Sequence, residues 1–250
     1  MRSLRTAAIA VGATAVIGAA TGCQAMNDIA TSIDIPSQAP VSTQTDQVPE
    51  PGNAAVTTSA DVADALTLLG QLPVKGRAPK TGYSRAQFGK AWTDNVNVEG
   101  GHNSCPTRED ILARDLVDIV YMPGKKKCKI KSGTLHDSYT GKTIHFQRGE
   151  QTSSMVQIDH RVALSNAWQT GAQQLTVEQR TALANDPANL VAVDGPTNQK
   201  KSDGDAATWL PPLKSGRCQY VSAQITVKHT YHLWVTPPEK QAMERILSAC

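Results

Sequence analysis

Two stretches of sequence decide the fold: residues 154–168, SMVQIDHRVALSNAW, and residues 189–212, NLVAVDGPTNQKKSDGDAATWLPP. Each contains a short apolar run, MVQI in the first and LVAV in the second, with the length and composition of a β-strand. After the second run, Asp194-Gly195-Pro196 supplies turn chemistry, and residues 197–201 have the composition of a short helix. The sequence therefore predicts the order strand, strand, helix.

Asp159 and His160 directly follow the first run, where a strand ends and its side chains meet solvent. A histidine near its ordinary pKa of about 6.5 accepts a proton at neutral pH, which makes His160 a candidate general base. The neighbouring carboxylate of Asp159 is an oxygen ligand of the kind that Mg²⁺ prefers, and Mn²⁺ is plausible. Together these groups have the chemistry to activate a water for the hydrolysis of a phosphodiester.

This arrangement resembles the ββα-metal, or HNH, nuclease motif, and more closely the exported actinobacterial proteins of the GmrSD C-terminal (DUF1524) family. The motif residues that match are Asp159-His160, Asn189-Leu190, Asn198 and Lys201. Flanking blocks match in the same order, and they are CPTREDILARDL at 105–116, SGTLHDSYTGKTI at 132–144 and SDGDAATWLPP at 202–212. The resemblance covers roughly residues 72–250. It departs from the motif at Asn198, which stands in place of a histidine and keeps an oxygen ligand.

The resemblance implies an α+β fold, in which a ββα-metal motif is embedded in a mainly helical domain with a small β-hairpin and two disulfides. The site residues that it implies are the general base His160, the metal ligands Asp159 and Asn198, the loop-fixing Asn189, and the phosphate-binding Lys201 and Lys200. Arg108 is a further candidate for holding a phosphate or a carboxylate, and Asp203 is a candidate outer partner of the site. His102, in a polar loop, is a minor candidate.

Five cysteines are present, and four of them, Cys105, Cys128, Cys218 and Cys250, lie in the region of the resemblance. An even number in an exported chain favours two disulfides, for which three pairings exist. Sequence proximity and the family resemblance both favour Cys105 with Cys128 and Cys218 with Cys250. A zinc site made of the four thiolates is disfavoured because no pair has the C-x2-C spacing.

The N-terminal residues 1–22 carry two arginines and then an alanine-rich apolar run, which is typical of an export signal. The run ends in Ala-Thr-Gly-Cys23, which is similar to a bacterial lipobox and makes Cys23 a candidate lipidation site; an ordinary signal peptide is the alternative. Residues 23–58 are rich in Thr, Ser, Gln, Pro and Asp, so we expect a flexible tether. The nuclease-like domain would then span residues 59–250. We expect an exported protein, either a membrane lipoprotein that faces outward or a secreted one.

Charge is distributed unevenly along the chain. Residues 24–74 contain six acidic residues and no Lys or Arg, whereas residues 75–250 contain 23 basic and 16 acidic residues, a formal charge of +7. A positive domain suits a polyanion such as nucleic acid, although an acidic envelope polymer would be bound equally well. No protein partner is implied.

Other segments give local expectations. Residues 60–72 have helical spacing, with Ser59 or Asp61 as a cap, and Thr107 is expected to cap a helix whose apolar face extends to Ile119. Phe88 and Trp92 would form an apolar i,i+4 pair. Helices are also expected over residues 162–168, 176–185, 218–231 and from 236 to the C-terminus, and a hairpin over residues 133–146. Five lysines within residues 125–131 would form either a protective hairpin edge or a phosphate-binding wall.

The sequence leads to three classes of function to consider. The first is an exported, metal-dependent endonuclease that hydrolyses DNA, and RNA as a second substrate, with low sequence specificity. The second is a non-catalytic envelope lipoprotein that binds an anionic polymer through its basic surface. The third, a hydrolase of another substrate, is disfavoured because the sequence contains no HExxH, GxSxG or P-loop pattern.

Overall fold

The computed structural model describes residues 57–124, 127–149 and 153–250. These residues form an α+β fold with seven α-helices, two small antiparallel sheets and two disulfides, as the resemblance implied. The helices are α1 (Ser59–Gln71), α2 (Thr107–Asp115), α3 (Leu164–Gln169), α4 (Val177–Asn185), α5 (Gly195–Lys201), α6 (Arg217–Thr230) and α7 (Pro237–Leu247). Short 3-10 turns are η1 (Arg85–Phe88), η2 (Ala172–Gln174) and η3 (Lys214–Gly216). None of the described helices combines the length and apolar character that a membrane span needs.

Two sheets carry the strands of the fold. The first is three-stranded in the order β1-β2-β3, and its strands are β1 (Leu116–Tyr121), β2 (Ile130–His136) and β3 (Thr143–Gln147). The second is the two-stranded pair of β4 (Val156–His160) and β5 (Leu190–Asp194). In this pair His160 lies opposite Leu190 and Asp159 opposite Val191. Strands β4 and β5 and helix α5 follow in the predicted order, which confirms the strand, strand, helix prediction.

Strand β5 is buried on both faces, which explains its uninterrupted apolar run. Leu190 and Ala192 pack with β4, α2 and the three-stranded sheet. Val191 and Val193 point the other way and pack with α1, α6 and α7. The motif is therefore held between two hydrophobic clusters.

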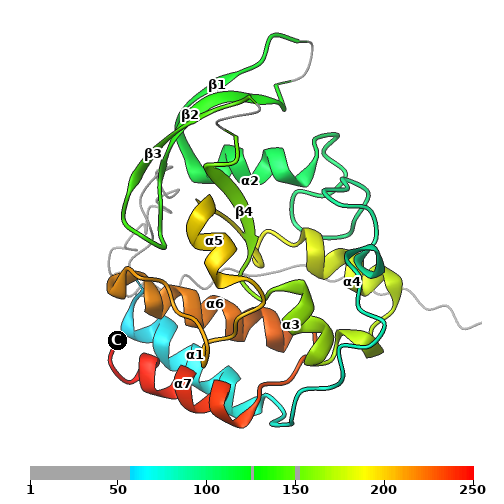
Figure 1. Ribbon diagram of the computed structural model, residues 1–250, viewed down its shortest axis with the longest axis vertical. Helices are drawn as coiled ribbons and strands as arrows, with labels where there is room; N and C mark the ends of the chain where they lie inside the picture. Colours follow the sequence, from blue (N-terminus) through cyan, green and yellow to red (C-terminus); the bar gives the residue numbers. More distant parts are fainter. Residues whose placement is uncertain (1–56, 125–126, 150–152) are drawn as a thin grey trace, which may run out of the picture. The chain divides into compact units, whose positions relative to one another are not determined.

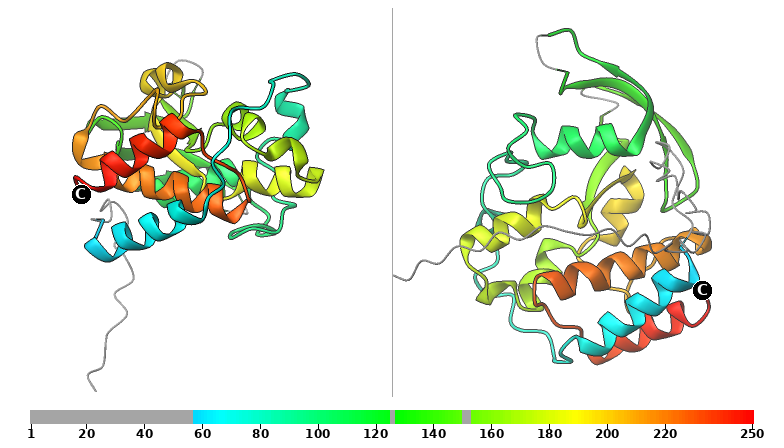
Figure 2. Two further views of the ribbon diagram at one scale, coloured as in Figure 1. Left: turned by 90° about the horizontal axis from the view of Figure 1, so that it is seen from below. Right: turned by 180° about the vertical axis from the view of Figure 1, so that it is seen from behind.

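Helices α1, α6 and α7 pack against one another beneath this motif (Figure 1). The two turned views in Figure 2 also show the three helices side by side, although α1 is distant in sequence from the other two. The Cys218–Cys250 disulfide joins the start of α6 to the residue at the end of the chain, as predicted. The C-terminal segment is thereby fixed to the layer that supports β5.

Reciprocal side-chain capping defines the start of three helices. Thr58, Thr176 and Thr236 each form a capping box with the residue three places on. The box at Thr176 with Gln179 confirms the prediction for α4. The N-cap of α1 is Thr58, with Asp61 as its reciprocal partner three places on, so the prediction of Ser59 or Asp61 as the cap was wrong.

Helix α2 is shorter than predicted, because it ends at Asp115 and the chain continues as β1. The prediction of a helical face that extends to Ile119 was therefore wrong. Leu116 lies opposite Leu135 in β2, and the run LVDIVY is rich in β-branched residues that favour a strand. The expected hairpin is accordingly part of a three-stranded sheet.

Two further local expectations were wrong. The residue that caps α2 is Pro106, and the Thr107 hydroxyl instead donates to the carbonyl of Thr93 at 2.9 Å. Phe88 and Trp92 share no helix, because η1 ends at Phe88 and Trp92 has a positive φ of 57°. Trp92 packs at the edge of the cluster around the three-stranded sheet, whereas Phe88 belongs to the cluster around α3 and α4.

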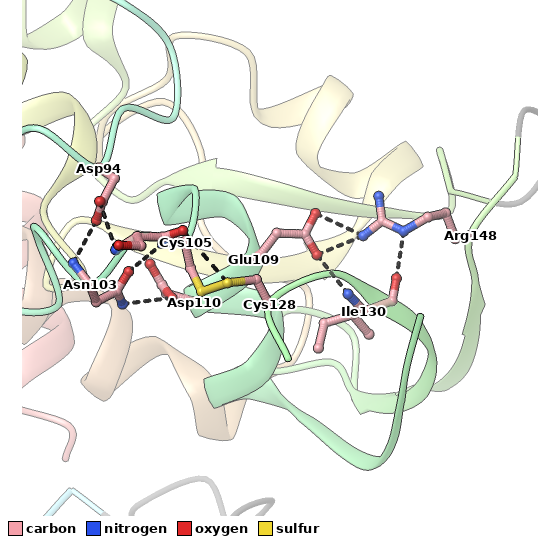
Figure 3. Close-up of a disulfide and its surroundings, with 9 residues drawn as sticks. Asp94, Asn103, Cys105, Glu109, Asp110, Cys128, Ile130 and Arg148 are labelled. Carbon is pink, nitrogen blue, oxygen red and sulfur yellow. Dashed lines mark hydrogen bonds and ion pairs between the residues drawn. A yellow bond between two sulfur atoms is a disulfide. The ribbon is translucent and has the colours of Figure 1, made fainter. Parts of the chain in front are cut away.

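The Cys105–Cys128 disulfide, also as predicted, links the start of α2 to the connection that leads into β2 (Figure 3). Next to it, the buried carboxylate of Glu109 accepts from the Ile130 backbone N–H at 2.9 Å and from Arg148 at 2.7 Å. These contacts tie α2 to both β2 and the end of β3. Glu109 is thus a structural residue of the matched TRE segment.

Some predictions fall on segments outside the described residues. These are the export signal at 1–22, Cys23, the tether up to residue 56, and Lys125 and Lys126 of the lysine run. The described lysines of that run lie in the turn before β2 or on β2, which is the central strand of its sheet. For Lys127, Lys129 and Lys131 the interpretation as a sheet edge is therefore wrong.

Candidate active site

Asp159 and His160 lie side by side at the end of β4, which pairs antiparallel with β5. Val156 and Ile158 anchor the strand in the cluster around the three-stranded sheet. Both polar residues are nearly enclosed, with relative exposures of 5% for Asp159 and 7% for His160. Buried polar groups need partners, so their contacts define what each side chain can do.

The ring of His160 is held on two sides. Its Nε2 lies 2.9 Å from the carbonyl oxygen of Ala184, and the ring stacks on Trp92 with centroids 6.0 Å apart. A carbonyl only accepts, so Nε2 carries the proton of the neutral ring and Nδ1 is left as the acceptor. Nδ1 has no hydrogen bond to any described residue, and this leaves a proton-accepting atom in a fixed ring.

Burial lowers the pKa of His160 to about 4, although the hydrogen bond to Ala184 and the charge of Asp159 act in the opposite direction. The cationic groups of Arg85 and Lys201 add to the lowering of this pKa. At neutral pH the ring is therefore neutral and retains its lone pair. The pKa is lower than the ordinary value on which the sequence-based prediction relied.

Asn189 supports the histidine through the backbone. Its Oδ1 accepts from the Val162 N–H at 2.8 Å, and its Nδ2 donates to the Leu183 carbonyl at 3.1 Å. Leu183 precedes Ala184, whose carbonyl holds the ring. Asn189 is fully buried and orients the ring indirectly, by tying the loop after β4 to the end of α4.

Asp159 forms a buried ion pair with Lys201. Its Oδ1 accepts from Lys201 Nζ at 3.0 Å, and its Oδ2 accepts from the Tyr139 hydroxyl at 2.7 Å. Lys201 also donates to the His160 carbonyl at 2.8 Å, and its side chain is 0% exposed. The structure therefore contradicts the prediction that Lys201 contacts a phosphate, because its ammonium is enclosed and already paired.

Tyr139 is a site residue that the sequence analysis missed. Burial, with the neighbouring charge of Asp159, raises the pKa of Tyr139 well above its ordinary range, so it remains a hydrogen-bond donor. It lies within the matched block at 132–144, but a tyrosine in a turn carries no local sign of a contact with a carboxylate on another sheet.

Asn198 lies on α5, which begins with the cap of Asp194 on the Thr197 N–H at 2.9 Å. The Asn198 side chain is half-buried, and its Nδ2 donates to Gln157 Oε1 at 3.0 Å. This bond leaves Oδ1 without a hydrogen bond to the described part of the chain. The amide oxygen is therefore available as a ligand.

Asp159, His160 and Asn198 line one open cleft of about 350 Å³. The structure thus brings together the predicted base and both predicted metal ligands. Asp203 lies on the same cleft, where it accepts from Ser165 at 2.9 Å and pairs with Lys80 at 3.2 Å. The hydrogen bond from Ser165 is the main cause of the lowered pKa of Asp203.

Three other candidates lie away from this cleft. Arg108 is on α2, where its guanidinium is 3.9 Å from Glu109, and burial lowers its pKa. Lys200 is exposed and lines a neighbouring cleft of about 470 Å³. His102 lies in the loop before α2 and contacts Asn97 at 3.0 Å. The structure therefore does not support Arg108 or His102 as members of the site.

The donor set fits a divalent metal in its chemistry. A carboxylate and an amide oxygen are suitable ligands for Mg²⁺ or Mn²⁺, and each oxygen of Asp159 keeps a lone pair beyond its one hydrogen bond. The described residues contain no group of three or more His, Cys, Asp and Glu side chains placed to hold a metal ion. A site with the two protein ligands Asp159 and Asn198 would rely on water for the rest of its shell.

Two comparisons with known proteins found matches to this chain. Residues 106–246 match the family described as GmrSD restriction endonucleases, C-terminal domain. The chain is also 38% identical to an uncharacterized secreted protein of Arthroderma benhamiae. The aligned 205 residues cover 81% of this chain and 90% of that protein. No solved structure matches the chain.

Proposed function

The chain belongs to the family of the GmrSD restriction endonuclease C-terminal domain, and on that premise we propose that it is an HNH-type, metal-dependent endonuclease. The family suggests a nuclease and a nucleic acid substrate. DNA is the proposed substrate, with RNA as the second, and cleavage would show little sequence preference. The observation that carries this proposal is the meeting of Asp159, His160 and Asn198 in one cleft.

In the proposed reaction His160 takes a proton from water at Nδ1, while Nε2–H remains bonded to the Ala184 carbonyl. The positive charge that develops on the ring is offset by the carboxylate of Asp159 beside it. Asp159 and Asn198 would hold a divalent metal, Mg²⁺ or Mn²⁺. When bound, such an ion stabilises the negative charge on the phosphodiester and on the departing 3′ oxygen.

The test is cleavage of supercoiled plasmid, single-stranded DNA and RNA with Mg²⁺, with Mn²⁺ and with a chelator. We expect cleavage with metal, and a loss of about 10²- to 10⁴-fold in the His160→Ala variant, because that is the usual contribution of a general base. His145→Ala is the matched control, since His145 is an exposed histidine on β3 and should be dispensable. Equal activity of the wild type and His160→Ala would overturn the assignment of the base.

The non-catalytic alternative predicts a different result in the same assay. A chain that binds these polymers but cleaves none of them with either metal would be a binding protein of the envelope. The formal charge of +7 over residues 75–250 accounts for binding in both cases, so turnover alone separates the two functions.

Export and a lipid anchor are part of the same proposal. Residues 1–22 would be the export signal, Cys23 the lipidated residue, and residues 59–250 the nuclease domain. The two disulfides and the relative described as secreted support export. Cell fractionation tests the anchor: the wild type should sediment with membranes and Cys23→Ser should appear in the medium. An unchanged distribution would rule out the anchor.

A further inference from the structure

The cleft has a second wall that the family match does not include. Lys80, Tyr83 and Arg85 line the cleft beside His160 and Asn198, yet they precede residue 106, where the match begins. This segment was assigned no function from the sequence. Its place along the cleft means that it would meet any substrate that reaches His160.

Packing holds this segment in place. Phe88 is 2% exposed, and its ring lies 6.3 Å from those of both Tyr83 and Trp168. Arg180 on α4 donates to the Gln87 carbonyl at 2.7 Å. A residue on η1 is therefore presented to the cleft from a supported backbone, which reduces the entropy lost when it binds a ligand.

The cations along this wall differ in their pairing. Lys80 contacts Asp203 at 3.2 Å, and Arg77, which lines the neighbouring cleft, contacts Asp205 at 2.6 Å. The exposed guanidinium of Arg85 makes no hydrogen bond or ion pair with any residue that the structure describes. The carboxylate of Asp159 is paired with Lys201, so it is not a counterion of Arg85. Arg85 thus gives the cleft a positive charge without an internal counterion.

Arg85 shares the lining of two hollows with His160. It lines the cleft that contains His160, and it also lines the smaller, adjoining pocket of about 210 Å³ that Trp92 and His160 share. Because Arg85 borders two hollows that His160 also borders, an anion bound by its guanidinium would occupy a space that His160 lines. A planar guanidinium with several donors is suited to two oxygens of one phosphate.

We propose that Arg85 binds a phosphate of the substrate backbone in this cleft, the function that the sequence-based prediction had given to Lys201 or Lys200. This inference rests on the proposed nuclease function. The contact carries no base recognition, which agrees with low sequence specificity. On this view the segment that precedes the matched residues 106–246 contributes a phosphate-binding group to the cleft.

The experiment measures affinity apart from turnover. A fluorescent single-stranded oligonucleotide is titrated with the full chain carrying His160→Ala, in chelator, with and without Arg85→Ala. We expect Arg85→Ala to weaken binding about tenfold, and to reduce the slope of log affinity against log salt by about one, because one phosphate contact is lost. Arg85→Lys keeps the charge but loses the planar guanidinium that can bind two phosphate oxygens, so it should recover part of the affinity.

Arg245→Ala is the matched control, because Arg245 is an exposed arginine on α7 that has no partner among the described residues. Arg245→Ala removes one positive charge at a position outside the cleft. Its affinity for the oligonucleotide should stay within about twofold of that of the His160→Ala chain. Unchanged unfolding midpoints would show that the variants are folded.

The outcomes separate the two proposals. If the wild type cleaves and Arg85→Ala binds and cleaves as well as the wild type, the assignment of Arg85 is wrong and the nuclease function stands. If Arg85→Ala and Arg245→Ala weaken binding equally, the effect is that of net charge and the assignment is again wrong. If the wild type neither binds nor cleaves any nucleic acid, both proposals are overturned.

Discussion

At the scale of single residues, the buried pair of Lys201 and Asp159 should contribute strongly to the stability of the fold. Lys201→Ala would leave the carboxylate of Asp159 enclosed without its counterion, and breaking such a pair typically costs about 3 to 5 kcal/mol. Lys200→Ala is the matched control, because the neighbouring side chain is exposed and its loss should cost less than about 0.5 kcal/mol. Urea unfolding at neutral pH measures both, and equal midpoints would contradict the structural role of Lys201.

A second residue-scale prediction concerns acid stability. Burial alone would raise the pKa of Asp205, but hydrogen bonds from Arg77 and Thr208 outweigh it and lower the pKa below its ordinary value of 3.8. A carboxyl with a lowered folded-state pKa stabilises the fold above that ordinary value, and the stabilisation is lost as the pH falls through the folded-state pKa. The stability difference between the wild type and Asp205→Asn should therefore be largest at neutral pH and shrink below about pH 4. Urea unfolding across this range tests it; a constant difference would refute the linkage.

The residues of the site differ in how far the sequence could predict them. Asp159 and His160 were identifiable because they are adjacent at the end of an apolar run, and Asn198 because it stands at the last position of the motif that the sequence resembles, on the short helix after the turn. Lys201 was misassigned, since a helix of seven residues gives too little periodicity to tell its buried face from its exposed one. Arg85 has no local signal at all, because its position depends on how a distant segment packs against α3 and α4.

At the scale of secondary structure, α5 depends on a single cap. Asp194 accepts from the Thr197 N–H at 2.9 Å and from its hydroxyl at 2.6 Å, and α5 carries Asn198. Asp194→Ala should therefore lower stability by about 1 kcal/mol and also reduce cleavage, since the amide of Asn198 loses its support.

Thr58→Ala is the control for this cap. It removes the capping box of α1, which lies outside the cleft, so it should cost a similar free energy of unfolding without loss of cleavage. Chemical unfolding and plasmid cleavage are measured on both variants. If both lose activity to the same extent, activity follows global stability and the specific role of α5 is wrong.

The boundary between α2 and β1 shows where local patterns fail. Leu112, Leu116 and Ile119 have helical spacing, but the run after Asp115 also suits a strand, and pairing with β2 decides between them. The carboxylate of Asp115 accepts from the Ala192 N–H at 2.7 Å, which connects this turning point to β5. A helix or strand is predicted from a short segment of sequence, and such a segment contains no information about these long-range contacts.

At the scale of the whole molecule, the site depends on a helical layer that contributes none of the three proposed catalytic and metal-binding groups. Val191 and Val193 rest on α1, α6 and α7, and the Cys218–Cys250 disulfide closes the end of this layer. The layer therefore supports the strand opposite Asp159 and His160 from behind. We expect loss of the disulfide to lower the free energy of unfolding of the domain, with little effect on the activity of the folded site.

The double variant Cys218→Ser/Cys250→Ser tests this separation. The bridge closes a loop with a sequence separation of 32, and its removal should lower the free energy of unfolding by about 3 to 4 kcal/mol, since the unfolded chain gains freedom. Well below the unfolding transition, the variant should cleave within about twofold of the wild type, because the three site side chains lie on β4 and α5 and not on the segments that the bridge joins. Urea unfolding with and without a reductant measures the first effect, and plasmid cleavage at 25 °C the second. A large loss of cleavage in a variant that is still folded would show that the helical layer sets the geometry of the cleft as well as its stability.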